Sequence, residues 1–264
     1  MYTFDYQRPA NAAAAAAALQ GDARYLAGGQ SLVQAMKLRL SSSERLVDLG
    51  AAADLKGIKV DGANVVIGAM TTHAAVARSA EVRKAIPALA ELAGGIGDQM
   101  VRNMGTLGGS IANADPAADY PAAVVGLGAT VNTNKRAIAA DAFFTGLYET
   151  ALQPGELITS VSFPVPQKAA YVKYKQPASR FALVGVFVSQ SAGGVRVSVT
   201  GARSSVFRAT QIEDALKAGF TAAAAKAVKM PEADINSDLH ASAAYRAAMI
   251  SVMASRAVEK ALAR

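Results

Sequence analysis

The sequence predicts an α+β fold in three successive parts, and three observations indicate it. Helical and strand-like segments alternate up to about residue 57. The next stretch holds the densest glycine region, between Gly94 and Gly128, and ends near Pro164 and Pro166. After Pro166, β-rich runs come first and helical segments follow. We therefore expect the parts to span residues 1–57, 58–166 and 167–264.

The first part opens with a run of alanines that predicts a helix from residue 12 to about residue 20. Alanine is the best helix former, Asn11 can cap the start, and Gly21 can end the helix. The other expected elements are a strand at residues 24–27, a helix or helical turn at 32–40 and a strand at 46–49. Gly28 and Gly29 separate the first of these strands from the helical segment.

The second part is expected to begin with two strands joined by a turn at residues 60–64, the second strand spanning 65–69. Thr72 can cap a helix that begins at His73, and a short helix over residues 86–92 ends at Gly94 and Gly95. Residues 157–163 alternate in polarity like a half-buried strand, which stops at Pro164.

The third part is predicted to be a small antiparallel sheet with a helical layer. Residues 170–175 and 181–189 are strand-like, and a hairpin turn at Gly193 and Gly194 leads to a strand at 195–199. Beyond Ile212 the pattern is helical. In the last helix we expect an apolar stripe near Tyr245, Met249, Val252, Met253 and Leu262, with Arg246, Arg256 and Lys260 outside it.

The composition excludes several kinds of chemistry. Among the 264 residues there is no cysteine, so the chain has no disulfide, thiolate nucleophile, cysteine zinc site or iron–sulfur cluster of its own. The two histidines, His73 and His240, lie far apart in the sequence, which disfavours a histidine-rich metal site. No acid–base pair and no nucleophile with a neighbouring base stands out, so we assign no catalytic residue.

The charge pattern disfavours nucleic-acid binding. Lys and Arg total 27 against 20 Asp and Glu, a net charge of +7, but they are scattered, and aromatic residues make up only 6%. A modest positive excess better suits a phosphorylated ligand or an acidic partner subunit. Only 18% of residues are charged, against an average of about 25%, which argues against disorder and favours a surface covered by a partner.

The N-terminus carries Asp5, Arg8 and Pro9 where a signal peptide needs an apolar run. No stretch of about 18 uncharged apolar residues occurs, so no segment is expected to span a membrane. We expect a cytoplasmic protein.

A first candidate site is the glycine loop at residues 27–32, Ala-Gly-Gly-Gln-Ser-Leu, between a strand and a helix. Glycine has no Cβ, so backbone N–H groups at Gly28 and Gly29 can approach an anion closely. Ser31 can donate a hydrogen bond to a phosphate oxygen. The loop lacks the spacing of a Rossmann motif and the lysine of a P-loop, and a tight turn with a serine cap explains it equally well.

A second glycine loop lies at residues 103–110, where Gly108 and Gly109 again offer bare backbone amides between the hydroxyls of Thr106 and Ser110. Asp119, which follows, can accept hydrogen bonds from sugar hydroxyls or can cap a helix ahead of Pro121. Because a diphosphate needs donors from more than one side, two such loops in one chain indicate a diphosphate site.

These two loops resemble those of the FAD-binding medium subunit of the molybdenum hydroxylases, of the aerobic carbon-monoxide-dehydrogenase and xanthine-dehydrogenase types. The likeness extends to residues 67–73, 102–105, 115–119 and 154–158 and to Tyr245 with Arg246, and it covers the whole chain. It implies a p-cresol methylhydroxylase (PCMH)/vanillyl-alcohol-oxidase-like fold, in which two α+β subdomains, residues 1–57 and 58–166, hold FAD. A C-terminal α+β domain, residues 167–264, follows them.

The resemblance also implies a set of cofactor-binding residues. The two loops hold the diphosphate, Asp119 binds sugar hydroxyls, and Ile158 packs near the adenine. Lys175 lies near the isoalloxazine, where it would stabilise the reduced flavin, unless it is a solvated strand lysine. Ile96 takes the place of an aromatic residue in xanthine-type relatives. The whole set is Tyr25, Leu26, Ala27, Gly28, Gly29, Gln30, Ser31, Leu32, Ile96, Thr106, Leu107, Gly108, Gly109, Ser110, Asp119, Ile158 and Lys175.

The implied activity is electron transfer within an oxidoreductase complex. FAD is expected to bind non-covalently, because there is no cysteine to attach it and His73, at a helix start, better suits a structural role. A large subunit carries the molybdenum cofactor and a small subunit carries two [2Fe–2S] clusters, in a dimer of heterotrimers. The acceptor is a quinone, O2 or NAD, and the oxidised substrate stays open. The alternatives are a stand-alone FAD-dependent oxidoreductase of the same fold and a scaffold that binds no flavin.

Overall fold

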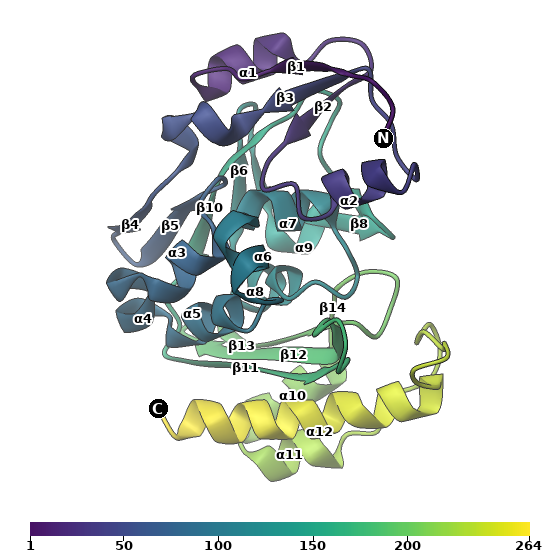
Figure 1. Cartoon of the computed structure of the whole chain (residues 1–264). Helices are drawn as coiled ribbons and strands as arrows, with labels where there is room; N and C mark the ends of the chain where they lie inside the picture. Colours follow the sequence, from purple (N-terminus) through teal and green to yellow (C-terminus); the bar gives the residue numbers. More distant parts are fainter.

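Three β-sheets, each made from a separate stretch of the chain, organise the molecule into stacked layers (Figure 1). The computed structural model describes every residue from 1 to 264. About 37% of residues are helical and 26% lie in strands, so the expected mixed α+β class is confirmed. The N-terminal sheet lies at one end, the C-terminal sheet with its helices at the other, and the middle part between them.

The N-terminal sheet is parallel and has three strands in the order β1 (Asp5–Gln7), β3 (Arg45–Asp48), β2 (Ala23–Leu26). Its helices are α1 (Ala12–Ala18) and α2 (Leu32–Lys37), followed after β3 by 3₁₀ turns at Leu49–Ala51 and Ala53–Leu55. As predicted, Asn11 caps α1, accepting a hydrogen bond from the Ala14 amide at 2.8 Å. Ala15 and Val47 are fully buried and form the centre of this small core.

The middle sheet has five antiparallel strands. Their order is β4 (Ile58–Asp61), β5 (Asn64–Gly68), β10 (Ile158–Pro164), β6 (Thr130–Thr133) and β7 (Ala137–Ala139). The strand predicted near residues 157–163 is therefore the central one, although its neighbour β5 lies far earlier in the chain. Its inward side chains, Val161 and Phe163, are fully buried beside Val65 and Ile67.

One side of this sheet is covered by helices. They are α3 (His73–Arg78), α4 (Ala80–Ala85), α5 (Pro87–Gly94), α6 (Gln99–Met104), α7 (Leu107–Asn113), α8 (Tyr120–Gly126) and α9 (Ala140–Phe143), with a small hairpin of β8 (Phe144–Gly146) and β9 (Glu149–Thr150). The glycine-dense region, to which the sequence assigned no regular element, forms α6, α7 and α8. The glycines serve close packing there: a Cβ on Gly126 would lie 2.6 Å from Ser198 Oγ.

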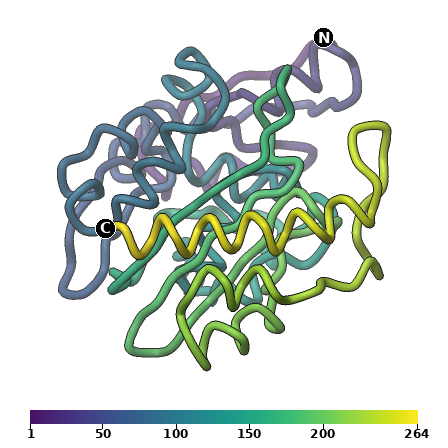
Figure 2. The backbone as a smooth tube through the Cα atoms, turned by 90° about the horizontal axis from the view of Figure 1, so that it is seen from below, coloured from purple at the N-terminus to yellow at the C-terminus, as the bar shows by residue number.

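The C-terminal sheet is antiparallel and runs in chain order. Its strands are β11 (Lys168–Lys175), β12 (Ala182–Ser191), β13 (Gly194–Thr200) and β14 (Phe207–Arg208), and its helices are α10 (Thr210–Ala218), α11 (Ala222–Ala227) and α12 (Ala243–Leu262). One face carries α12, which lies across the strands (Figure 2), and the other faces α5 and α8. Because both faces are covered, β12 is buried along most of its length.

The stripe predicted for α12 is partly wrong. Met253 is buried, but Tyr245 and Leu262 are exposed, and the buried face is formed mainly by small residues around Ile250. Arg246, expected outside the stripe, is buried. Its guanidinium donates to the carbonyl oxygens of Leu183 and Gly201, at 2.7 and 2.8 Å. Alanine on the helix lets the strands approach closely, and an arginine fits because its N–H groups find backbone acceptors.

The three larger sheets fall on residues 5–48, 58–164 and 168–208, and the two-stranded sheet of β8 and β9 also lies in the middle stretch. The subdivision into 1–57, 58–166 and 167–264 stays a prediction. No helix of this chain has both the length and the apolar character needed to cross a membrane.

Truncating the side chain of Ile250, which is fully buried between α12 and the C-terminal sheet, is expected to be strongly destabilising. The Ile250→Ala variant should lose roughly 2–5 kcal/mol of unfolding free energy in urea or guanidinium titrations, because the cavity closes only in part. Leu239→Ala is the matched control, since Leu239 is 91% exposed. Equal losses in the two variants would contradict the described packing of α12.

Candidate functional site

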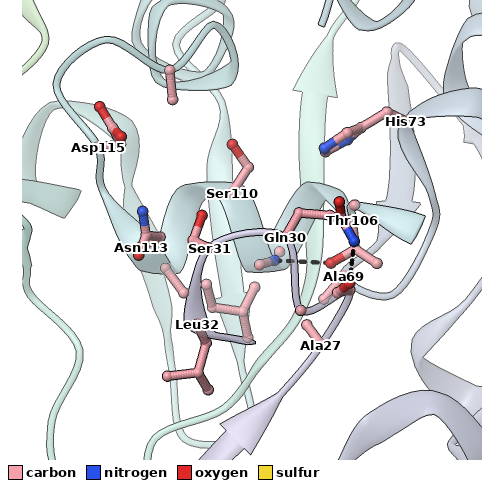
Figure 3. A pocket seen from close by; sticks show the side chains of 18 of the residues that line it. Ala27, Gln30, Ser31, Leu32, Ala69, His73, Thr106, Ser110, Asn113 and Asp115 are labelled. Carbon is pink, nitrogen blue, oxygen red and sulfur yellow. Dashed lines mark hydrogen bonds between the residues drawn. The ribbon is translucent and has the colours of Figure 1, made fainter. Parts of the chain in front are cut away.

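A cavity of about 490 Å³ lies where the three parts of the chain meet. The β2–α2 loop lines one side, α7 and the segment before it line a second, and the β11–β12 loop closes a third. Figure 3 shows the first loop, with Gln30 and Ser31, lying across the start of α7, where Thr106 and Ser110 are. Both glycine loops singled out in the sequence therefore contribute to one pocket.

The first loop presents unused backbone donors. No hydrogen bond within the chain uses the backbone N–H groups of Gly28, Gly29, Gln30 or Ser31. Gly29 has φ +71°, a left-handed conformation that glycine adopts without strain. A side chain on Gly28 would overlap the carbonyl oxygen of Met104, so only glycine fits where this loop contacts the end of α6. Several free amides in one short loop are suited to an anion.

The second loop differs from the expectation of bare amides. The Gly108 N–H donates to the carbonyl of Ala69 at 2.8 Å, and the Gly109 N–H donates to Thr106 Oγ1 at 3.1 Å. These amides hold α7 against β5 and cap its start, so they are already used. The glycines instead allow the two loops to approach each other closely, since a Cβ on Gly109 would lie 3.1 Å from Ala27 Cβ in the first loop.

Hydroxyl groups supply the remaining donors of the two loops. The side-chain hydroxyls of Ser31, Thr106 and Ser110 line the pocket, and none donates a hydrogen bond within the chain. Thr106 Oγ1 accepts the Gly109 N–H, so its own proton is free to point into the cavity. The first loop thus offers amides, and the second offers hydroxyls on a rigid helix start.

Asp119 is buried at the start of α8, where two side chains of β11 meet it. Lys173 Nζ donates to Asp119 Oδ2 at 2.9 Å and to the Gly95 carbonyl at 3.0 Å, and the Tyr171 hydroxyl donates to Asp119 Oδ1. Burial raises the pKa of the Asp119 carboxyl, while the Lys173 ammonium and the Tyr171 hydrogen bond act in the opposite direction. The hydrogen bonds among Asp119, Lys173 and Tyr171 tie the C-terminal sheet to the pocket wall and hold the Asp119 carboxyl group in that wall.

The β11–β12 loop brings a second cation to the pocket. Arg180 lines the cavity and donates to the Gly97 carbonyl at 3.1 Å, with its backbone at φ +63°. That contact joins the C-terminal sheet to the segment before α6, next to Ile96. Its neighbours Ser179 and Phe181 line the same end of the cavity.

The opposite end of the pocket is formed by Tyr25, Glu156 and Ile158. The Tyr25 hydroxyl donates to the Gly155 carbonyl at 3.3 Å. Glu156 is buried and paired with Arg136 at 3.0 Å, and the hydrogen bond from Arg136 lowers its pKa to about 2. This end is therefore a largely apolar wall around a carboxylate that is already neutralised by its partner.

His73 also belongs to the pocket wall. It is 5% exposed at the start of α3, and burial, followed by the charge of Arg102, lowers its pKa to about 4. Its ring lies 5.3 Å from that of Tyr120, centroid to centroid. The imidazole is therefore neutral near pH 7.

Of the seventeen residues predicted as cofactor-binding, fourteen line this one cavity; Leu26, Leu107 and Lys175 do not. Leu107 is fully buried in the core, Leu26 is half-buried in β2, and Lys175 is exposed. Sequence reasoning missed Lys173, Tyr171 and Arg180. The alternation that places Tyr171, Lys173 and Lys175 on one face of β11 was visible, but not that the strand meets α8 at Lys173.

Comparison with known proteins is consistent with this geometry. A family model described as the FAD binding domain in molybdopterin dehydrogenase matches residues 2–166. The carbon monoxide dehydrogenase medium chain of Afipia carboxidovorans is 40% identical over 99% of this chain and 98% of its own. The glyceraldehyde dehydrogenase medium chain of Sulfolobus acidocaldarius is 34% identical over 80% of this chain and 79% of its own.

A solved structure shows the same fold over nearly the whole length. The crystal structure of quinoline 2-oxidoreductase from Pseudomonas putida 86 contains a chain that superposes with a TM-score of 0.89. It is 30% identical and covers 98% of this chain and 97% of its own. The expected fold family is therefore confirmed.

Replacing Lys173 by methionine is expected to leave Asp119 as an uncompensated buried charge and to cost roughly 3 kcal/mol of unfolding free energy near pH 8. Burial already raises the pKa of Asp119, and loss of the ammonium raises this pKa further. At pH values between the ordinary carboxyl pKa and this raised pKa, the folded variant therefore binds a proton that the unfolded chain has released. The deficit should therefore shrink as pH falls toward about 4, the ordinary carboxyl pKa.

Denaturant titrations at several pH values measure this effect. Lys175→Met is the matched control, because Lys175 lies on the same strand but is exposed, and it should change stability by less than about 0.5 kcal/mol. A pH-independent loss in Lys173→Met would contradict the role given to Asp119.

Proposed function

The chain belongs to the family of FAD-binding domains of molybdopterin dehydrogenases, and on this basis we propose its role in full. It is the FAD-binding electron-transfer subunit of a molybdenum-containing hydroxylase or dehydrogenase. Electrons pass from [2Fe–2S] clusters of a partner subunit through FAD to an external acceptor. The observation that carries the proposal is the convergence of two glycine loops on one cavity, in a chain that matches medium chains over its length.

The pocket residues fit FAD. A diphosphate needs several hydrogen-bond donors from more than one side. Gly28 to Ser31 supply four unused amides, and Ser31, Thr106 and Ser110 supply free hydroxyls. The loops approach closely because Gly28 and Gly109 have no side chain. The cavity of about 490 Å³ is lined by residues of all three parts of the chain as well as by both loops, so it offers space beyond the diphosphate site.

The two ends of the pocket differ, which supports an orientation. The end near Ile158 and Tyr25 is apolar and suits the adenine. The end near Ile96 and Arg180 lies against the C-terminal sheet and suits the flavin ring. Asp119 can accept a hydrogen bond from a sugar hydroxyl of the cofactor, because each of its carboxylate oxygens has a lone pair that the hydrogen bond from Lys173 or Tyr171 does not use.

When bound, FAD accepts electrons singly and passes on pairs, and the chain's residues hold it for that purpose. Cations of the C-terminal sheet stabilise negative charge near the ring. Arg180 lines the pocket and Lys173 pairs with the lining residue Asp119, whereas Lys175, the lysine predicted for this task, is exposed and lines no part of the pocket. We keep Lys175 as a candidate only for contact with a part of the cofactor outside the cavity.

The partner subunits follow from what this chain lacks. With no cysteine, it cannot hold the [2Fe–2S] clusters, so these belong to a small partner subunit and the molybdenum cofactor to a large one. We propose a dimer of heterotrimers in the cytoplasm with a quinone, O2 or NAD as acceptor. The relatives named above are medium chains of dehydrogenases, and the stand-alone flavoenzyme gains no support from them.

The oxidised substrate is decided elsewhere in the complex. Proteins similar to this chain over most of its length are named for carbon monoxide, glyceraldehyde and quinoline, three unrelated substrates. Similarity to this chain therefore does not select one of these substrates.

Purification from the native host under mild conditions tests the assembly. We expect a flavin absorbance band together with iron–sulfur absorbance, and a gel with one larger and one smaller companion. A flavin band on the chain alone would instead favour a stand-alone enzyme. A colourless chain that takes up no FAD even with its companions would contradict the proposed site.

Placing a carboxylate between the loops tests the diphosphate site directly. Gly109→Asp and Ser110→Asp should each weaken FAD binding by about a hundredfold or more, through charge repulsion with the diphosphate in a partly buried site. Ser110→Asp guards against misfolding at Gly109, whose position is crowded by Thr106 and Ala27. The control is Gly219→Asp, at an open position with nothing within 4 Å. Unchanged FAD affinity in both loop variants would refute the site.

A further inference from the structure

His73 in the pocket wall and Tyr120, which packs behind it, each carry a buried polar atom without a partner. His73 Nδ1 and the Tyr120 hydroxyl are both buried and make no hydrogen bond. The rings lie next to each other, 5.3 Å between centroids and inclined by 49°. His73 is 5% exposed and Tyr120 is fully buried. The unpaired atoms therefore form one local feature at the edge of the cavity.

Such a feature needs a physical explanation. A buried donor or acceptor left unpaired loses the hydrogen bonds it had with water and destabilises the folded chain. Nearly all other buried side-chain polar atoms of this protein do have partners, including every oxygen of Asp119 and Glu156. The other nitrogen of the same imidazole, Nε2, is also without a hydrogen bond in the chain, and a polar ligand in the adjoining cavity can pair it.

The surroundings hold the imidazole at the cavity. The His73 backbone N–H donates to the Gly105 carbonyl at 2.9 Å, which ties the start of α3 to the segment before α7. Gly105 must be bare, since a Cβ there would lie 2.5 Å from His73 Nε2. Nε2 has no hydrogen bond within the chain and borders Gly105, itself a residue of the pocket wall. Figure 3 shows the imidazole extending from α3 toward the pocket.

The position of His73 relates it to one part of the cavity. His73 packs against Tyr120, which follows Asp119 in the sequence. It also lies near Arg102, whose positive charge lowers the pKa of His73 and whose guanidinium donates to the Ile96 carbonyl. His73 therefore stands between the second glycine loop and the Ile96–Arg180 end. On the proposed function, that is the stretch between the diphosphate and the flavin ring.

The protonation state of His73 limits which groups of a ligand it can bind. With its pKa lowered to about 4, His73 is neutral and offers one N–H donor and one acceptor nitrogen. A neutral imidazole with one donor and one acceptor suits a hydroxyl group, which can accept a hydrogen bond from one partner and donate to another. The stretch of FAD between diphosphate and ring is a chain of hydroxyls, the ribityl chain.

We propose that His73 is a cofactor-binding residue that hydrogen-bonds a ribityl hydroxyl of FAD through Nε2. This inference rests on the proposed function. It assigns to His73, for which the sequence suggested a structural role, a part in positioning the cofactor. Tyr120 packs against the imidazole and limits its movement.

Affinities for FAD and for ADP separate this role from other possibilities, because ADP has the diphosphate but no ribityl chain. In flavin-depleted protein purified with its partner subunits, His73→Phe should weaken FAD binding about tenfold, the loss of roughly one hydrogen bond. ADP, measured as a competitor, should bind as before. His73→Gln, which keeps an amide donor and acceptor, should recover most of the FAD affinity. His240→Gln, at an exposed position, is the control.

The outcomes are distinct. Unchanged FAD affinity in His73→Phe, or an equal loss for FAD and ADP, would overturn the inference, the second by placing the effect at the diphosphate or in the fold. Failure of the unsubstituted protein to bind FAD would overturn the proposed function itself, and this inference with it.

Nitrogen NMR of the full chain gives an independent readout, since His73 and His240 are its only histidines. With ¹⁵N-labelled histidine, we expect His73 to stay neutral near pH 7 with and without FAD, and its Nε2 signal to shift on saturation while His240 does not respond. Protonation of His73 on FAD binding would indicate an ion pair with the diphosphate and overturn the hydroxyl assignment. Unresponsive His73 signals in FAD-saturated protein would overturn the inference as well.

Discussion

The pocket depends on backbones that approach more closely than side chains would allow. Gly28 packs on the carbonyl of Met104, Gly105 on the ring of His73, and Gly108 on Ala69, where an added Cβ would lie 2.6 Å away. Each of these contacts joins segments from different elements, and none tolerates even a methyl group without a shift. The cavity is what remains between segments held at these distances, so its shape is set by the absence of side chains at a few positions.

The second constraint is the buried carboxylate of Asp119, which links the middle part to the C-terminal sheet. A buried charge is stable only where it is paired and hydrogen-bonded, and Lys173 and Tyr171 of β11 supply both. Hydroxyls of the same sheet reinforce the junction: Ser198 donates to the Ala122 carbonyl at 2.5 Å and Ser189 to that of Gly126 at 2.6 Å. The C-terminal sheet is therefore part of the pocket wall, and changes within it are transmitted to the cofactor site.

The same arrangement explains how one subunit can serve complexes with different substrates. The donors in the cavity wall include unused backbone amides, free hydroxyls, a neutral histidine and the guanidinium of Arg180, and together they suit a cofactor with a diphosphate. No side chain in the wall forms an acid–base pair: Asp119 and Glu156 are neutralised by Lys173 and Arg136. A wall of this kind holds a redox group and leaves substrate chemistry to another subunit.

Local patterns in the sequence were sufficient for the fold class, most elements and the two glycine loops. The Asn11 cap, the central strand ending at Pro164 and the hairpin near Gly193 depend on neighbouring residues, and their residue types indicate them directly. The absence of cysteine by itself excluded iron–sulfur clusters from this chain. Only the tertiary structure decided which groups are free: it showed that the Gly108 and Gly109 amides are already bonded while those of Gly28 to Ser31 are not. It also decided that Lys173 rather than Lys175 pairs with the pocket residue Asp119, that Arg246 is buried, and that His73 meets Tyr120. These facts depend on contacts between segments distant in the chain, and no local pattern specifies which segments will touch.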